Sequence, residues 1–369
     1  MRQCFRNWFS AWPAGPVRFF VHVLLGLTLF APLEARSESE LPIWIVNTKL
    51  SGDFRYRHEG IDRELTDALY RNRVRYRIGI QTQVNEHVLV GMRLATGRMD
   101  PRSTNQDLED GLTPKFIYLD RAYGELTDGG HWWTTMGRFA NPMTATDLQW
   151  DADVAFEGGV VRYSRGEAIK TSVTAGGIWL EPYRNQHGAG IWVGQATLAG
   201  QAGDAKWTAS AGVYSYVLGA MVDPVANGNT LLDNRYLRDY EVFDVVFSAT
   251  LPGMMKSKWT VTLNPLLNTA TSEKNTGWLA SVNWKGKVLE RSASWSYDYR
   301  TLEADAVIGS FVDSDVAGGR TDQRSHRLSA EMGVIEGFSL GGAAIFSTLS
   351  SQGDGDWYQR WMLDGQIKF

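Results

Sequence analysis

The sequence predicts an all-β protein: a transmembrane antiparallel β-barrel of about 16 strands, with short periplasmic turns and long extracellular loops. Three observations predict this fold. Many segments alternate between polar and apolar residues over lengths that suit a tilted membrane strand of about 9–11 residues. The connections between these segments alternate between short and long. Beyond the N-terminal region, no apolar run approaches the roughly 20 residues that a membrane helix needs.

The N-terminal region has the pattern of a secretory signal peptide. Arg2, Arg6 and Arg18 precede the apolar residues 19–31, and the small residue Ala35 follows them. A retained transmembrane helix is the alternative, but the apolar run is shorter than the roughly 20 residues of a membrane span. We therefore predict a signal peptide over residues 1–35 and an outer-membrane β-barrel domain over residues 36–369.

Composition excludes several function classes. The only cysteine, Cys4, lies within the predicted signal peptide, so the mature chain can hold no disulfide framework, cysteine zinc site or thiol nucleophile. The formal net charge of −4 gives no basic footprint for nucleic acid. No HExxH, GxSxG, phosphate-loop or dinucleotide motif occurs. We expect no enzyme, no cofactor and no metal, although Asp151 and Asp153 could bind a cation weakly.

Two strand candidates show the alternation most clearly. In residues 357–369, tryptophan, leucine, isoleucine and phenylalanine occupy one face and mainly polar residues the other. In residues 70–84, four arginines share one face, which could not lie in a dry core without partners but could line a wet lumen. The other predicted strands are 50–58, 88–98, 115–126, 132–140, 157–164, 169–181, 190–200, 205–217, 240–250, 258–267, 276–286, 291–302, 323–334 and 338–349.

The lengths of the connections indicate how the predicted barrel is oriented in the membrane. Short connections fall at 85–87, 127–131, 165–168, 201–204 and 335–337, and long ones fall at 99–114, 141–156, 218–239 and 303–322. Outer-membrane barrels have short periplasmic turns and long extracellular loops. An even strand number with both chain ends in the periplasm follows from this pattern.

Several segments resemble the putative porin family of bacterial outer-membrane proteins, a general-porin-like group with 16-stranded barrels. They are SGDFRYR at 51–57, RNRVRYR at 71–77, GMRLATG at 91–97, LDRAY at 119–123, GRFANP at 137–142 and LQWDAD at 148–153, followed by Glu157-Gly158. The resemblance covers roughly residues 50–165 and implies a diffusion pore for small hydrophilic solutes and a homotrimer. The terminal Phe369 resembles the signal read by the barrel-assembly machinery, and outer-membrane lipid and lipopolysaccharide would surround the barrel.

Candidate functional residues fall into two sets of opposite charge. The first is a basic wall in the first three predicted strands: Arg55, Arg57, Arg71, Arg73, Arg75, Arg77 and Arg93. The second is acidic and lies in or beside the loop 141–156: Asp147, Asp151, Asp153 and Glu157. By resemblance to general porins, this loop would fold into the barrel and narrow it. An acidic loop opposite a basic wall would produce a field across the constriction that selects ions.

Alternatives remain open at this stage. The arginines could simply pair with lumenal carboxylates and keep the barrel closed, a role that is compatible with permeation. An outer-membrane barrel hydrolase could use His187 or His326 with a nearby serine, although no motif supports it. A structural or adhesive barrel without an open pore is the third alternative.

Overall fold

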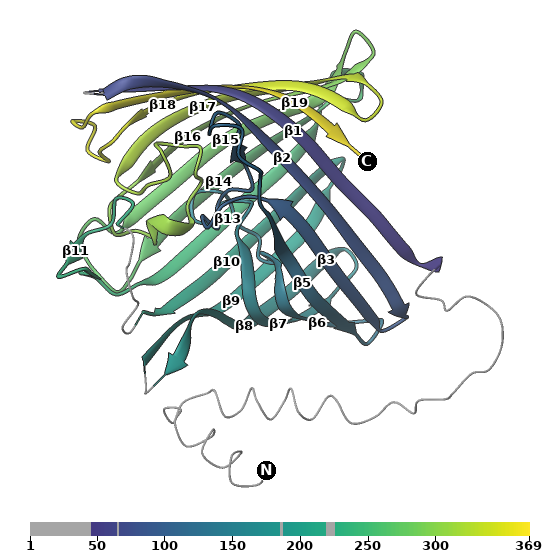
Figure 1. The fold of residues 1–369 in the computed structure, drawn as a ribbon. Helices are drawn as coiled ribbons and strands as arrows, with labels where there is room; N and C mark the ends of the chain where they lie inside the picture. The colour runs from purple at the N-terminus through teal and green to yellow at the C-terminus, as the bar shows by residue number, and fades with distance from the viewer. Residues whose placement is uncertain (1–45, 65, 185–186, 219–225) are drawn as a thin grey trace.

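The computed structural model describes residues 46–64, 66–184, 187–218 and 226–369. These residues form one antiparallel sheet that closes on itself as a barrel of tilted strands (Figure 1). The signal peptide predicted over residues 1–35 lies outside the described residues. Within the described residues, no helix is long and apolar enough to cross a membrane.

Sixteen long strands build the barrel wall, and the prediction of 16 strands is confirmed. They are β1 (Thr48–Arg63), β2 (Thr66–Asn85), β3 (Val88–Thr96), β5 (Ile117–Thr127), β6 (Trp132–Ala140), β7 (Ala155–Arg165), β8 (Ile169–Arg184), β9 (His187–Ala202), β10 (Ala205–Val217), β13 (Glu241–Pro252), β14 (Lys258–Asn268), β15 (Thr276–Val288), β16 (Arg291–Leu302), β17 (Gln323–Ile335), β18 (Phe338–Thr348) and β19 (Trp357–Lys368). The short strands β4 (Gln106–Asp107), β11 (Leu231–Leu232) and β12 (Arg235–Tyr236) lie in connections.

Each long strand pairs with its sequence neighbour, and β1 also pairs with β19, which closes the barrel. Closure runs through eleven register pairs, from Asp53 opposite Lys368 to Arg63 opposite Tyr358. A closed barrel leaves no sheet edge, so the strand backbone groups are bonded without water, as a bilayer interior requires.

The alternation predicted for the strands separates two environments. In β19, Trp361 and Leu363 are exposed on the outer face, whereas Tyr358, Arg360 and Met362 are buried inside the barrel. In the same way, β2 points its arginines inward and exposes Tyr70, Tyr76 and Ile80 outside. An outer surface of aliphatic and aromatic residues fits a lipid environment.

The connections follow the expected long and short ends, with two exceptions. Two connections at the long-loop end are short. β1 ends at Arg63 and β2 begins at Thr66, and β8 ends at Arg184 and β9 begins at His187. The strands predicted at 50–58 and 70–84 therefore extend toward each other. The extension places Glu59 directly opposite Arg71, so an ion pair across the ladder favours continued pairing.

Two long loops fold into the barrel. We call residues 141–154, between β6 and β7, the first inward loop, and residues 303–322, between β16 and β17, the second inward loop. Together with inward-facing residues of the strands from β6 to β16, they form a buried apolar cluster. Trp150 of the first loop stacks on Phe311 of the second, with ring centroids 5.3 Å apart. The loops are thus held to one wall by apolar packing.

Candidate functional site

The predicted basic wall is the inner face of the β1–β2 ladder. Arg55 lies opposite Arg75, and Arg57 lies opposite Arg73. Like charges directly opposite each other destabilise a sheet, so this face needs carboxylates nearby. The ladder supplies one at each end, where Asp53 lies opposite Arg77 and Glu59 lies opposite Arg71.

Glu59 is the centre of the largest group of ion pairs, which we call the β1–β2 cluster. Its side chain is 0% exposed and accepts from Arg71 and, at 2.6 Å, from Arg360, and it forms an ion pair with Arg73 at 3.6 Å. Arg57 belongs to the same cluster through a bidentate pair with Asp364, at 2.7 and 2.8 Å. Such forked guanidinium–carboxylate pairs fix side-chain geometry as well as charge.

The other predicted arginines are also paired. Arg75 and Arg77 share Asp53, with closest contacts of 2.7 Å for both. Arg93 pairs with the buried Asp120. Arg55 donates to the side-chain oxygen of Asn105 at 2.6 Å. The structure therefore brings the seven predicted arginines together on the inside of the first three strands, and it surrounds them with acids that the prediction did not include.

The predicted acids do not stay together. Asp153 contacts the basic wall, because its Oδ1 accepts from Arg77 at 3.0 Å. Asp147 instead pairs with two arginines outside the predicted wall, Arg300 and Arg327. Asp151 accepts the backbone N–H groups of Asp153 and Ser314, at 2.9 and 2.8 Å.

Glu157 differs most from its predicted place. It lies on β7 and pairs with Arg138, and its side chain is more than half exposed. Its neighbour Phe156 packs in the apolar cluster inside the barrel. Since successive strand residues point to opposite faces, Glu157 points away from the interior. It is not an acid of the inward loop.

The second inward loop was not expected from the sequence. Asp315 of this loop contacts Arg57 at 3.0 Å and Arg360 at 2.9 Å, and so adds a carboxylate to the β1–β2 cluster. The loop is also tied to the connection 97–116, because Arg102 donates to the backbone carbonyls of Gly309 and Gly319 at 3.1 and 2.7 Å. Three connections therefore meet inside the barrel at its long-loop end.

A second ion-pair group, the β16–β17 cluster, anchors both inward loops. Arg327 contacts Asp147, Asp298 and Asp313, each at 2.7 Å. Arg300, only 1% exposed, contacts Asp298 at 2.7 Å and Asp147 at 3.1 Å. Because Asp147 comes from the first loop and Asp313 from the second, two strand arginines hold both loops in one place.

The carboxyl groups of the inward loops titrate differently. Burial opposes ionisation of Asp147, but Arg300 and Arg327 outweigh burial and hold the pKa of Asp147 below its usual range. Burial and the adjacent Asp147 carboxylate raise the pKa of Asp313. Burial also raises the pKa of Asp151, to about 7, since the backbone N–H groups of Asp153 and Ser314, which lower it, offset burial only in part. The two loops therefore carry a proton-sensitive contact.

Cation binding finds no support at these acids. Among the described residues, no group of three histidine, cysteine or acidic side chains is placed to hold a metal ion. Asp153 is already occupied by Arg77 and by the Thr104 hydroxyl, which donates at 3.0 Å.

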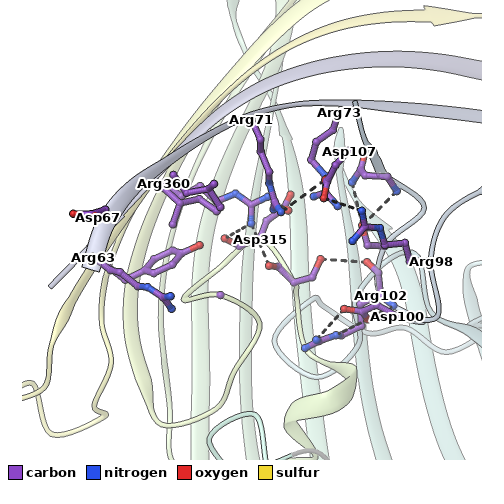
Figure 2. Close-up of a pocket in the computed structure, with 17 residues that line it drawn as sticks. Arg63, Asp67, Arg71, Arg73, Arg98, Asp100, Arg102, Asp107, Asp315 and Arg360 are labelled. Atoms are coloured by element: carbon purple, nitrogen blue, oxygen red, sulfur yellow. Dashed lines mark hydrogen bonds and ion pairs between the residues drawn. The ribbon is translucent and has the colours of Figure 1, made fainter. Parts of the chain in front are cut away.

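Two cavities lie on either side of Asp315, whose side chain lines both. The first, of about 360 Å³, opens toward the long-loop end and is surrounded by arginines from β1, β2, β19 and the connection 97–116 (Figure 2). The second, of about 270 Å³, lies toward the short turns along the inner faces of β16 to β19, and serines and glycines contribute much of its lining.

Some of the missed residues had a signal in the sequence. Residues 304–312 include two alanines, two valines, an isoleucine and a phenylalanine, which is unusual for a solvated connection. An apolar loop followed by Asp313-Ser314-Asp315 suggests a segment that packs inside and ends in charge. Arg300, Arg327 and Arg360 give a weaker signal, since single arginines in alternating strands are common and most of their partners lie in other segments.

Comparison with known proteins identifies the family. A family model described as "Putative porin" matches residues 62–185 and 246–350, more than half of the chain. No curated protein matches the sequence.

Solved structures share the fold at low sequence identity. OprB of Pseudomonas putida is 12% identical, with a TM-score of 0.60, covering 88% of this chain and 94% of its own. OmpF of Salmonella typhi, in complex with daunomycin, is 13% identical, with a TM-score of 0.57 and coverage of 87% and 97%. OmpT of Vibrio cholerae, in a trimer form, is 12% identical, with a TM-score of 0.52 and coverage of 87% and 99%.

The family match and the closed 16-stranded barrel agree with each other and with the charged interior. The chain belongs to the putative porin family and is a channel protein of the bacterial outer membrane.

Proposed function

We propose that the protein conducts small hydrophilic or charged solutes by passive diffusion, through a constriction between the basic wall and the two inward loops. The basic side comprises Arg55, Arg57, Arg71, Arg73, Arg75, Arg77 and Arg93. The acidic side comprises Asp153 of the first inward loop and Asp315 of the second. Asp147 and Asp151 act behind the constriction by fixing the loops, and Glu157 takes no part.

One observation carries this proposal: the inward loops pack on the strands from β6 to β16 through a large apolar cluster and reach the basic wall of β1 and β2 through charged side chains. The second loop is also held by a small apolar cluster on β18 and β19. The apolar side of the loops lies in a core with residues such as Tyr214 and Leu266. The charged side reaches the wall through Arg77–Asp153 and Arg57–Asp315. Opposite charges across a narrow aqueous path with low-dielectric walls act strongly on a passing ion.

The pairing of the arginines is part of this function. Each carboxylate holds a guanidinium in a fixed position, so the wall keeps its shape while residual positive charge faces the solute. The two roles considered from the sequence, closing the barrel and guiding ions, thus fall on the same residues.

The test is conductance and reversal potential of purified, folded protein in planar bilayers under a salt gradient. We expect stepwise open currents, with folding confirmed by heat-modifiable migration on a gel. The sign of the reversal potential then tells whether the basic wall or the acids of the inward loops govern selectivity. Folded protein that never gives current would refute diffusion and favour a barrel without an open pore.

We also propose that the barrel forms a homotrimer, because a trimer form is known for the similar OmpT structure. Light scattering of the detergent-solubilised protein with the detergent mass subtracted tests this, and a monomer mass contradicts it. The C-terminal Phe369 would be read by the barrel-assembly machinery, and lipopolysaccharide would contact the outer leaflet end. We propose no catalytic role, since the charged residues of the interior pair with one another rather than forming a serine–histidine site.

A further inference from the structure

The cavity at the long-loop end, on the outer side of Asp315, has an excess of positive charge. Six arginines and four aspartates line it. The lining arginines are Arg63, Arg71, Arg73, Arg98, Arg102 and Arg360, and the lining aspartates are Asp67, Asp100, Asp107 and Asp315. The lining residues therefore carry a formal excess of two positive charges. Behind them, Glu59 contacts Arg71, Arg73 and Arg360, and the nearby Arg57 is paired with Asp364.

The arginines come from four segments and approach the cavity from different sides. Figure 2 shows Arg63 on one side, Arg98 and Arg102 on the other, and Arg71, Arg73 and Arg360 along the strand wall between them. Guanidinium groups that converge in this way match the oxygens of a small anion, because each presents several N–H donors in a fixed plane.

Carboxylates hold these arginines in place without using all of their donors. Asp107 contacts Arg73 at 2.9 Å, Arg98 at 3.3 Å and Arg71 at 3.8 Å, and so supports three arginines with one charge. Arg63 donates from Nε to the Thr66 hydroxyl at 3.0 Å, and among the described residues no carboxylate lies within ion-pair distance of it. Donors therefore remain on both sides of the cavity.

The second cavity provides an internal comparison. It contains two arginines, Arg57 and Arg327, and three acids, Asp315, Glu331 and Asp364. Its formal charge is one unit negative, although Asp315 belongs to both cavities. Positive charge is therefore concentrated on the outer side of the second inward loop and is not a general property of the lumen.

We propose that the outer cavity is a binding site for small oxyanions, meaning phosphate or small carboxylates, that captures them before they enter the constriction. The proposed ligand donors are Arg63, Arg71 and Arg98. Arg73, Arg102 and Arg360 are held by carboxylates and backbone carbonyls and shape the cavity wall. A volume of about 360 Å³ suits a ligand of a few non-hydrogen atoms with its nearest waters. A charged mouth of this kind raises the local concentration of the solute. The inference rests on the proposed diffusion function and specifies its substrate class.

The test measures interruption of single-channel current in chloride electrolyte by inorganic phosphate and, separately, by succinate. The oxyanion is added first to one side of the bilayer and then to the other. We expect concentration-dependent interruption that is stronger from the side of the long loops. In the double variant R63Q/R98Q, the half-inhibiting concentration should rise at least about tenfold, the effect of losing one charge-assisted hydrogen bond.

The matched control is R291Q, which removes an exposed arginine at the short-turn end of β16. Phosphate and succinate should interrupt the current of this variant at the same concentrations as in the wild type. If the double variant does not fold, R98Q alone replaces it, since the Arg98 side chain is 58% exposed and one carboxylate contacts it. Interruption by phosphate alone or by succinate alone identifies which oxyanion the site takes.

Two outcomes overturn the proposal. The first is a current that neither oxyanion interrupts at concentrations up to that of chloride, and the second is a block that R63Q/R98Q and R98Q leave unchanged. Absence of any current from folded protein refutes the diffusion function instead. In that case, calorimetric titration of phosphate into the detergent-folded wild type and R98Q decides the oxyanion site by itself, with binding lost in the variant as the expected result.

Discussion

The two halves of the barrel interior are stabilised by different interactions, apolar packing in one half and ion pairs in the other. From β7 round to β16, inward-facing residues and the two inward loops form an apolar cluster that excludes water. From β17 through β19 to β3, the inner face carries arginines and acids in ion pairs, beside a small apolar cluster in which Val316 and Ala317 pack on β18 and β19. The apolar half fixes the loops to the wall, and the charged half is the part available to water and solutes. In the proposed constriction, apolar packing on one side would narrow the channel together with the charged residues on the other.

Among the substitutions that test this comparison, Trp150→Ala should have the largest effect on stability. The Trp150 side chain is 4% exposed and packs on Phe156, Tyr214 and Phe311. Removal of a buried tryptophan costs about 3–5 kcal/mol in the free energy of unfolding. We expect that loss in urea titrations of the bilayer-reconstituted protein, with noisier open currents as the loops loosen.

The matched control is Trp361→Ala, on the lipid-facing side of β19, where the side chain is 37% exposed. Its effect should be clearly smaller. Equal effects of the two substitutions would contradict the expectation that packing of the inward loops contributes more to stability than an outer-face side chain does.

The second-largest loss of stability is expected for a substitution in the charged half. Glu59→Ala leaves Arg71, Arg73 and Arg360 without their shared carboxylate in a buried site. Uncompensated buried charge costs roughly 3 kcal/mol or more, reduced here if water enters the lumen. Unfolding titrations should show a loss somewhat below that of Trp150→Ala. Asp62→Asn, an exposed acid on the same strand, serves as the control, and an equal loss there would contradict the assignment.

The contact between the two loops should depend on pH. The pKa of Asp151 is about 7 in the folded protein, above its ordinary value of 3.8, so between these values the docked loops retain a proton that undocked loops release. Docking should therefore strengthen as the pH falls from 8 to 5. The ion pairs of Asp147, whose pKa is lowered, are lost only below the ordinary value of 3.8.

Hydrogen exchange of residues 303–322, corrected for the intrinsic effect of pH, measures this dependence. Protection should increase on acidification in the wild type and change less in Asp151→Asn, which has no titrating group at this position. Protection that decreases between pH 8 and 5 in the wild type would show that another group controls the contact.

The smallest effect tests the link between the two halves. Arg77→Gln removes the pairs with Asp153 and Asp53 and should cost only about 1 kcal/mol, because Asp53 keeps Arg75 and Asp153 keeps the Thr104 hydroxyl as a donor. It should still shift the reversal potential toward cation preference by removing a positive charge from the proposed constriction. Glu157→Gln, on the outer face, should change neither quantity measurably, and a shift there would restore Glu157 to the channel.

Much of the architecture followed from local sequence. Period-two patterns predicted each of the 16 long strands, and the ends of Trp132–Ala140, Ala205–Val217 and Arg291–Leu302 agree to the residue. A strand that faces lipid on one side and a wet or packed interior on the other must alternate, so the pattern is present within each segment. The inward face of the arginines in β1 to β3 follows from the same rule.

The site itself needed contacts between distant segments. Asp147 pairs with Arg327, 180 positions away, and Arg57 pairs with Asp315, 258 positions away. No local pattern ranks one carboxylate above another as the partner of a given arginine. Glu157 illustrates the limit, because β7 already begins at Ala155, so Glu157 lies within the strand on the outer face and not at the end of the loop.

The sequence by itself determined the barrel, its strand number, and the charged character of its first strands, because these depend on alternation along single segments. Only the tertiary structure decided that a second loop folds inward, that the two loops share an apolar core, and that positive charge gathers in the outer cavity. The physical reason is that burial and ion pairing depend on which segments meet in space. Closure of the barrel determines which distant segments come into contact, and the sequence of a single segment does not show these contacts.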